Sequence, residues 1–293
     1  MKSEIKSLLV DLGISDEQSI VPFYPRVRDR DDISVLECQK SGVLFLSRAD
    51  HMNISHYETT KDFKYWGAED RNAAALKGIE DARRRAEQFK NIITNKKWMD
   101  VGTGAGGILD LLSPVASATL AVEPQDSARK HLTELGYSVY RTVDEAPCND
   151  LEVVTLFHVF EHLVDPVGIL DKLRTKMSRG AKIIIEVPHA KDFLISFLAL
   201  DAFKAYTFWS EHLILHTRDS LRIFLERAGF ENICIEGYQR YPLANHLYWL
   251  ARGMPGGHIA WNHLRSSALD SAYGDMLAHL DNTDTLIAIA TND

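Results

Sequence analysis

Short apolar runs and segments of helical periodicity alternate along the chain from Lys97 onward. The apolar runs are rich in β-branched residues and almost unbroken, as strands in a buried parallel sheet are. Strands are expected over 98–101, 118–123, 151–157 and 181–187, with helices over 106–112, 127–135 and 166–177. This alternation predicts an α/β domain whose parallel sheet is covered by helices on both faces.

After Thr217 the pattern changes. The stretch "TRDSLRIFLERAGF" starts with a threonine that suits a helix N-cap and ends at Gly229, which suits a helix stop. A strand over "ENICIEGY", about three dozen helical residues and a final strand over "DTLIAIAT" are expected to follow. The region before Asn95 is less regular and ends in a charged segment, 69–93, for which one long helix is expected. We therefore predict an N-terminal cap lobe (1–95) and a main domain (96–293) with a helical insertion at about 241–282.

Composition narrows the class of protein. The 293 residues carry a net charge of −8, which argues against a nucleic-acid-binding surface. The longest apolar tract, 193–209, is interrupted by Asp201 and Lys204, so no membrane span is expected. Cys38, Cys148 and Cys234 are far apart and form no CxxC pair, which argues against disulfides and predicts a cytoplasmic protein.

The stretch "KKWMDVGTGAGGILDLL" contains the main candidate for a binding site. Gly102, Gly104 and Gly107 form GxGxxG, which permits a tight turn from strand to helix and brings a ligand close to the backbone. Asp100 precedes the turn, where it would repel a pyrophosphate but attract a cation beside an adenosine. S-adenosylmethionine is such a ligand. Glu123 ends the next strand, where a carboxylate can bind both ribose hydroxyls.

These motifs resemble those of the class I S-adenosylmethionine-dependent methyltransferases, over about residues 96–293. "DVGTGAGG" matches the glycine motif of that family, and "VVTLFHVFEHLVDP" (153–166) matches the segment that lines the methionine side of the cofactor. The resemblance implies a Rossmann-like, doubly wound sheet of seven mostly parallel strands with a reversed last strand. It also implies a set of cofactor-binding residues: Asp100, Gly102, Thr103, Gly104, Gly106, Glu123, Pro124, Asp144, Phe157, His158, the lid aromatic Tyr57, and Arg84 for the methionine carboxylate.

The stretch "FWSEHLILHT" (208–217) suggests the catalytic residues. It resembles the segment of sugar methyltransferases in which a Glu-His pair lies near the acceptor. That resemblance implies His212 as the base, since histidine titrates near neutral pH, and Glu211 as the residue that orients the acceptor. His212 could instead cap or pack a helix end. His158 is a second candidate base, and His162 is expected to be structural.

No metal site is expected. His212 and His216 have the i, i+4 spacing of helical metal ligands, but neither an HExxH order nor a third ligand is recognisable. The stretch "DDISVLECQKSGVLFLS" (31–47) resembles a small zinc-binding hairpin module. Cys38 stands alone there and Ser41 takes the place of a second cysteine, which predicts a hairpin without metal.

The sequence therefore predicts a methyltransferase acting on a small polar acceptor, best described as a sugar or a nucleotide-linked sugar. An aromatic or quinone-like acceptor is the alternative among methyltransferases. An NAD-dependent oxidoreductase and a non-catalytic binding protein are the alternatives outside that class. The acceptor atom and the oligomeric state stay open.

Overall fold

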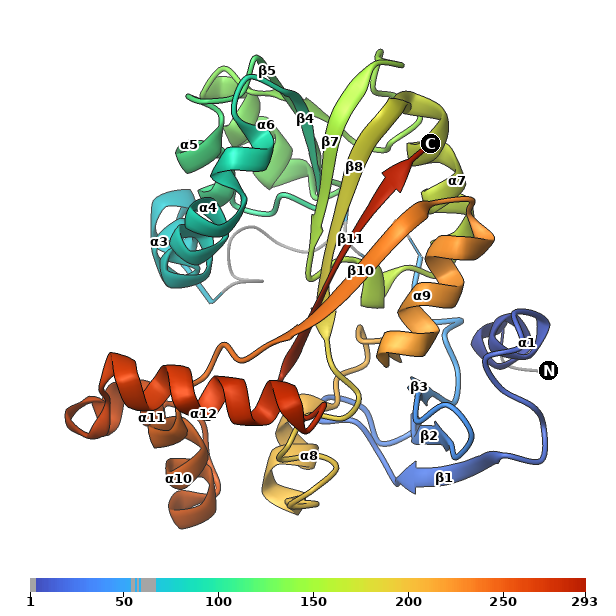
Figure 1. Ribbon diagram of the computed structural model, residues 1–293, viewed down its shortest axis with the longest axis vertical. Coiled ribbons are helices and arrows are strands. Elements are labelled where there is room, and N and C mark those ends of the chain that lie inside the picture. Colours follow the sequence, from blue (N-terminus) through green and yellow to red (C-terminus); the bar gives the residue numbers. More distant parts are fainter. Residues whose placement is uncertain (1–3, 54–55, 57, 59–66) are drawn as a thin grey trace.

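Two β-sheets organise the protein in the computed structural model, which describes residues 4–53, 56, 58 and 67–293 (Figure 1). The larger sheet has seven strands in the order β10-β11-β8-β7-β4-β5-β6. Its strands are β4 (Lys97–Val101), β5 (Ala118–Val122), β6 (Ser138–Tyr140), β7 (Leu151–Phe157), β8 (Met177–Pro188), β10 (Glu231–Tyr238) and β11 (Thr285–Asn292). The smaller sheet has the order β1-β2-β3-β9, formed by β1 (Ile20–Tyr24), β2 (Val35–Cys38), β3 (Leu44–Leu46) and β9 (Ile214–Leu215).

The strands of the larger sheet run parallel except β11, which is antiparallel to both β8 and β10. The prediction of a doubly wound, mostly parallel seven-stranded sheet with a reversed last strand is thereby confirmed. The α-helices are α1 (Glu4–Asp11), α3 (Arg71–Lys77), α4 (Ile79–Ile93), α5 (Gly107–Leu112), α6 (Asp126–Glu134), α7 (Pro166–Lys176), α8 (Asp201–Thr207), α9 (Arg218–Arg227), α10 (Leu243–Arg252), α11 (Gly257–Ala260) and α12 (Ser267–His279). Two 3₁₀ turns, η2 (Phe160–His162) and η3 (Asn262–Leu264), complete the described elements.

Helices cover the larger sheet on both faces, as Figure 1 shows. On one face, Phe89 of α4 and Leu109 of α5 pack with the fully buried Trp98 of β4. On the other face, Leu170 of α7 and Phe224 of α9 pack into the larger core cluster. Burial of apolar side chains on both faces explains why the strand segments are almost continuously apolar.

The segment 69–93 is divided, where the sequence suggested one long helix. The Asp70 side chain accepts a hydrogen bond from Ala73 N and caps α3, and Gly78 separates α3 from α4. The two helices also belong with the main domain, because α4 packs on α5 and Arg71 donates to Ala105 O in the glycine-rich turn at 2.7 Å. Helices α3 and α4 thus pack with the main domain, and the domain boundary at residue 95 stays a prediction.

The smaller sheet joins segments that are far apart in the sequence, because β1, β2 and β3 lie within residues 20–46 and β9 is formed by residues 214–215. β2 and β3 form the predicted hairpin, and β3 pairs with β9, so that Phe45 lies opposite Ile214. The buried Cys38 thiol lies 3.3 Å from Ser19 Oγ and is a free cysteine. Within the apolar tract 193–209 only α8 is helical. The tract starts with a turn in which the Asp192 side chain accepts a hydrogen bond from Leu194 N.

The insertion after β10 contains α10, α11 and α12. β10 runs in the same direction as β8, because both are antiparallel to β11. The insertion therefore leaves the sheet at the edge where the parallel strands end (Figure 1). None of the helices in the described part of the chain has the length and apolar character needed to cross a membrane.

Candidate active site

The turn after β4 depends on its glycines. Gly102, Gly104 and Gly106 have φ angles of +72°, +56° and +75°, in the left-handed region that side chains disfavour. Gly102 N donates to Val122 O of β5 at 2.7 Å, which ties the turn to the neighbouring strand. A Cβ atom at Gly102 would lie 2.4 Å from Val159 Cγ2. The turn therefore needs glycine at this position both for its backbone angle and for its close contact with the segment after β7.

Glu123 lies beside this turn at the end of β5. Its carboxylate accepts hydrogen bonds from Gly104 N at 2.7 Å and from Gln125 N at 2.8 Å. Burial raises the pKa of Glu123 to about 7. Two backbone donors fix the carboxylate at the wall of the cavity described next, so the residue is oriented before any ligand binds.

A cavity of about 510 Å³ opens at the carboxyl ends of β4, β5 and β7. Its volume falls in the range of small-molecule sites, about 300–1,000 Å³. The lining residues are Met52, Asn53, Val101, Gly102, Gly104, Val122, Glu123, Pro124, Gln125, Arg141, Thr142, Val143, His158, Val159, His162, Leu163, Val164, Asp165 and Ile169. The glycine turn, the carboxylate of Glu123 and the volume of the cavity fit the predicted cofactor, S-adenosylmethionine.

Five of the predicted cofactor residues line the cavity: Gly102, Gly104, Glu123, Pro124 and His158. Thr103 and Gly106 belong to the same turn but are not among the lining residues. Tyr57 lies outside the described residues.

The remaining four predicted residues have other partners. Asp100 is buried beneath the turn and accepts a hydrogen bond from Thr155 Oγ1 at 2.5 Å, and burial raises its pKa to about 6. The exposed Asp144 lies 2.6 Å from Lys172 Nζ. Phe157 stacks on Phe89 with ring centroids 5.6 Å apart. Arg84 forms an ion pair with Glu186 and is not among the lining residues.

Several residues that line the cavity were not predicted from the sequence. Met52 and Asn53 reach the cavity from the N-terminal region, and Thr142 and Val143 follow β6, a strand of three residues. Leu163 lies in the segment after β7, where only His158 and Phe157 had been assigned to the cofactor. The apolar run of a strand as short as β6 is too brief to stand out, and nothing local to Met52 marks it as part of a cavity.

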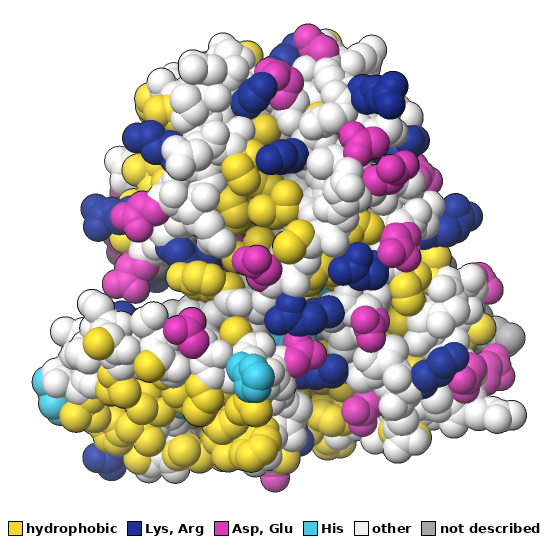
Figure 2. Space-filling model, in the orientation of Figure 1, with side chains coloured by type: hydrophobic (Ala, Val, Ile, Leu, Met, Phe, Trp, Pro, Cys, Tyr) yellow, Lys and Arg dark blue, Asp and Glu magenta, His cyan; other side chains and the backbone are white. Residues whose placement is uncertain are grey.

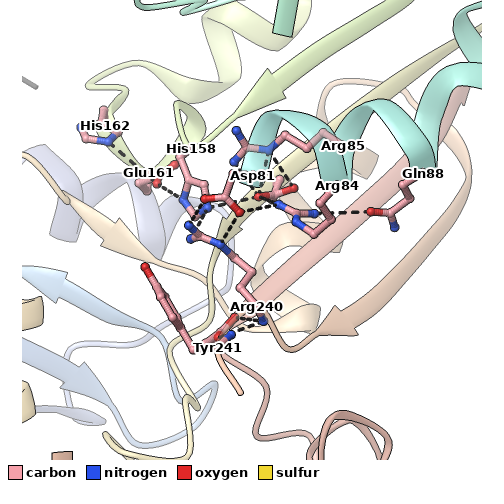
Figure 3. A network of polar contacts seen from close by, with 11 residues as sticks. Asp81, Arg84, Arg85, Gln88, His158, Glu161, His162, Arg240 and Tyr241 are labelled. Atoms are coloured by element: carbon pink, nitrogen blue, oxygen red, sulfur yellow. Dashed lines mark hydrogen bonds and ion pairs between the residues drawn. The ribbon is translucent and has the colours of Figure 1, made fainter. Parts of the chain in front are cut away.

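His158 connects the cavity to a buried network of charges, shown in Figure 3. Its backbone has φ +55°, which is uncommon for a residue with a side chain. Nδ1 lies 3.1 Å from Glu161 Oε1, and Nε2 lies 2.9 Å from Arg240 Nη1 and 3.2 Å from Glu186 Oε1. Burial and Arg240 disfavour the charged ring, but contacts with the two glutamates hold the pKa of His158 above its usual value.

The network is held by two further sets of ion pairs. Arg84 Nη2 and Arg85 Nη2 each lie 2.7 Å from Glu186 Oε1. Burial opposes ionisation of Glu186, yet Arg85 and His158 keep the pKa of this carboxyl well below its usual range. Arg240, from the start of the insertion, forms a two-point contact with Asp81 of α4. In Figure 3 these side chains meet from α4, the strand ends and the insertion, so three segments close around His158.

The predicted Glu-His pair lies next to this network. Glu211 is buried, and its Oε1 lies 2.9 Å from His56 Nε2. The His212 ring packs edge-on against His162, a lining residue, with centroids 4.9 Å apart. His212 itself is not among the lining residues. Its buried Nδ1 has no hydrogen-bond partner among the described residues, and burial lowers its pKa to about 3. The imidazole is therefore neutral near pH 7.

His216 points elsewhere. It is fully buried between Phe160 and Phe224, at ring distances of 5.2 and 5.3 Å, so the i, i+4 spacing does not bring it to His212. Among the described residues, Glu161, His162 and His212 could hold a metal, because their ligand atoms lie within 4.8 Å of one another. The absence of a metal therefore stays a prediction, and Glu161 with His162 replaces His216 as the place to look.

Comparison with known proteins supports the fold and the class of reaction. The family described as "Methyltransferase domain" matches residues 68–235. A ubiquinone biosynthesis O-methyltransferase of Actinobacillus pleuropneumoniae is 34% identical over 103 residues, covering 30% of this chain and 44% of that protein. The ubiquinone biosynthesis O-methyltransferase of Histophilus somni is 24% identical over 199 residues, which cover 59% of this chain and 80% of that protein. The chain thus spans less than half the length of the first of these relatives.

Solved structures resemble the fold. A S-adenosylmethionine-dependent methyltransferase from Archaeoglobus fulgidus has a TM-score of 0.50 at 18% identity, covering 78% of this chain and 96% of that one. A chain in the complex between the Haloferax volcanii Trm112 methyltransferase activator and a methyltransferase has a TM-score of 0.54 at 12% identity, covering 80% and 99%. At these identities, the likeness concerns the fold.

Proposed function

The chain belongs to the family of methyltransferase domains, and from this premise we propose that it methylates a hydroxyl group on a small aromatic or quinone-like acceptor. S-adenosylmethionine supplies the methyl group as its cofactor, held by the glycine turn and Glu123. The alternatives of an NAD-dependent oxidoreductase and a non-catalytic protein are set aside, because the matched family is one of methyltransferases.

The observation that carries the acceptor class is the apolar character of the cavity, which has to hold the reacting end of the acceptor beside the cofactor. Although polar side chains also line it, most of its exposed surface is apolar and comes from side chains such as Met52, Leu163 and Ile169. An apolar wall suits a flat ring better than a sugar, whose hydroxyls need hydrogen-bond partners. The names of the relatives, which are ubiquinone biosynthesis O-methyltransferases, support the same class.

A sugar or nucleotide-linked sugar is the second candidate. Buried Glu211, held by His56, is the kind of carboxylate that accepts hydrogen bonds from sugar hydroxyls. The expectation that the acceptor is not a nucleic acid rests on the net charge of −8 and stays a prediction.

The geometry favours His212 as the group that takes the proton from the acceptor hydroxyl. Both ring nitrogens of His158 have partners, which leaves this residue to shape the wall. The buried Nδ1 of His212 has none among the described residues, and a buried polar atom without a partner is costly. His212 is not itself a lining residue, and it meets the cavity through its ring contact with His162. Its imidazole is neutral, so a ring nitrogen can accept a proton, and burial makes it a weaker base than a histidine in water. Glu211 orients the acceptor beside it.

A methyl-transfer assay tests the acceptor. The protein is incubated with S-adenosylmethionine labelled in the methyl group and either 3,4-dihydroxybenzoate or a nucleotide-linked hexose. We expect label in the aromatic product. Label in the sugar alone would replace the first candidate by the second.

Variants test the residue roles. His212→Asn should lower turnover by about a hundredfold while leaving the affinity for S-adenosylhomocysteine unchanged. Glu211→Gln should cause a smaller loss, seen mainly in acceptor affinity. Full activity in His212→Asn would contradict the assignment, and His158→Asn would then be the next variant to measure.

A further inference from the structure

Two imidazoles and one carboxyl group meet behind the wall of the cavity. Glu161, His162 and His212 each offer one ligand atom, and these atoms lie within 4.8 Å of one another. We call these three residues the Glu161 cluster. His162 belongs to the lining of the cavity, so a small ion can reach the cluster from there. Two imidazoles and one carboxylate bind zinc in several enzymes, with a fourth position left for water or another ligand.

Two segments of the chain bring the Glu161 cluster together. Glu161 and His162 are consecutive in η2, directly after β7, and His212 lies just before β9. Leu213 N donates to Glu161 O at 2.9 Å, which ties the second segment to the first beside the cluster. Trp209 packs edge-on against both rings, with centroids 6.0 Å from His162 and 5.4 Å from His212. Backbone and ring contacts therefore hold the three residues close to one another.

Two buried atoms of the cluster have no hydrogen-bond partner among the described residues. They are Glu161 Oε2 and His212 Nδ1. The other oxygen of the same carboxyl, Glu161 Oε1, lies 3.1 Å from His158 Nδ1, which fixes the orientation of the group (Figure 3). Buried polar atoms without partners cost free energy. A divalent cation satisfies a carboxylate oxygen and an imidazole nitrogen at the same time.

The surroundings of His162 also match those of a metal ligand. A ligating histidine usually has a carboxylate, a carbonyl or water at its second ring nitrogen. His162 Nε2 lies 3.8 Å from Glu161 Oε1, and His162 Nδ1, on the other side of the ring, lies 4.0 Å from Glu211 Oε2. Glu211 is buried, and His56 contacts its other oxygen. One nitrogen of His162 therefore faces the cluster, and the other faces a second carboxyl group.

The ligand atoms select the ion. Imidazole nitrogen suits Zn²⁺, whereas Mg²⁺ and Ca²⁺ prefer oxygen ligands. Zinc bonds of about 2.0–2.1 Å place tetrahedral ligand atoms about 3.4 Å apart, so the cluster must close by at most about 1.4 Å around the ion. A site that has to tighten binds less strongly than one already in its final geometry. This favours a reversible ligand over a resident metal.

We propose that the Glu161 cluster binds Zn²⁺ reversibly and that the bound ion inhibits methyl transfer. The inhibition rests on the proposed function, in which His212 takes the proton from the acceptor hydroxyl. A nitrogen lone pair that coordinates an ion cannot also bind this proton, so the hydroxyl stays protonated and a poor nucleophile. The site itself rests on the geometry of the cluster alone. The prediction that the protein contains no metal concerns a resident ion and is compatible with a reversible one.

Titration of the ion without any acceptor tests the site. Untagged full-length protein is titrated with Zn²⁺ in a calorimeter, and far-ultraviolet circular dichroism checks the folding of each variant. We expect one ion per chain. Glu161→Gln and His162→Asn should each weaken binding by about a hundredfold, because loss of an outer partner alone costs about 10–100-fold. Glu211→Gln, which alters such an outer partner, should weaken it by about tenfold. Unchanged affinity in both Glu161→Gln and His162→Asn would overturn the proposal.

Histidines at the surface are the main competitors for zinc. Figure 2 shows histidine side chains over the region of α10–α12, where His263 and His279 are exposed. His263→Asn/His279→Asn should bind Zn²⁺ like the unchanged protein. So should Cys234→Ser, which removes the exposed thiol. Loss of the ion in either control would place it outside the Glu161 cluster and overturn the proposal.

Turnover tests the inhibition. A metal buffer holds Zn²⁺ at ten times its dissociation constant, and the assay uses whichever acceptor is methylated. Turnover should fall by about tenfold, as occupancy by mass action requires, and a chelator should restore it. Mg²⁺ at the same concentration should have no effect. Unchanged or raised turnover with zinc bound would overturn the inhibition. A lack of methyl transfer without zinc would count against the proposed function alone, because calorimetry decides on the site without an acceptor.

Discussion

At the cofactor end of the cavity, the glycine turn and Glu123 come from two neighbouring strands and are joined through backbone groups. At the other end, His158 is surrounded by charged side chains from α4, β8 and the insertion, and the Asp81–Arg240 pair joins residues 159 positions apart. The first region depends on the absence of side chains, and the second depends on their charges. The two ends should therefore fail in different ways when single residues are changed.

The largest effect is expected at the turn. Gly102→Ala places a Cβ 2.4 Å from Val159 Cγ2 at a φ of +72°, so the turn must shift, and affinity for S-adenosylhomocysteine should fall by about a hundredfold. Titration calorimetry measures this. Gly136→Ala is the control, because φ is +91° there but no atom lies within 4 Å of the new Cβ. Equal losses of affinity in both variants would show that backbone strain alone matters.

Removing a charge from the network around His158 should lower the stability of the protein. Arg240→Met leaves Asp81 partly buried without its main partner, which should lower the free energy of unfolding by about 3 kcal/mol. Urea denaturation followed by tryptophan fluorescence gives the value. The double variant Asp81→Asn/Arg240→Met should recover at least half of the loss, since no unpaired charge remains. No recovery would mean that Arg240 acts by packing.

The two ends should also respond oppositely to pH. Burial raises the pKa of Glu123 to about 7, so its contribution to stability is present below about 4.5 and is lost as the pH rises through 7. Burial lowers the pKa of His212 to about 3, so its contribution is present above about 6.5 and is lost as the pH falls.

Between pH 5 and 7, Glu123→Gln should therefore gain about 2 kcal/mol relative to the unchanged protein, and His212→Asn should lose about as much. Urea denaturation at both pH values tests this. Shifts of the same sign in both variants would contradict the opposing effects of burial.

The smallest effect is expected at Asp144. Its carboxylate is exposed and pairs with Lys172 rather than facing the cavity. Asp144→Asn should change the free energy of unfolding by less than about 0.5 kcal/mol and leave S-adenosylhomocysteine affinity unchanged. A tenfold loss of affinity in calorimetry would restore the residue to the cofactor site, as the family resemblance implied.

How much of the structure can be predicted from the sequence depends on how far apart along the chain the interacting residues lie. Gly102 and Glu123 could be recognised because each is defined by the strand just before it, and the β/α alternation determines where those strands end. Asp144 was placed by its position in the family pattern, and Arg84 by the need of the cofactor carboxylate for a cation. The direction of each side chain, however, depends on partners such as Lys172 and Glu186.

The residues near the proposed acceptor site also depend on contacts that the local sequence does not reveal. His216 has helical spacing from His212 yet lies in the core, while His162 reaches the cavity. No local pattern marks Arg240 as the partner of Asp81, because their contact exists only after the insertion folds against α4.

The pairing of β3 with β9 has a consequence for synthesis. Leu44 and Phe45 lie opposite Leu215 and Ile214, so the edge of the hairpin stays unpaired until some 170 further residues have left the ribosome. Until then the strand edge is open and Phe45, which is fully buried in the folded protein, is exposed, so the hairpin is prone to pair with strands of other chains. Nascent chains that stall before residue 214 should therefore be a main source of aggregates, and chaperones that bind β-edges should engage this hairpin early in translation.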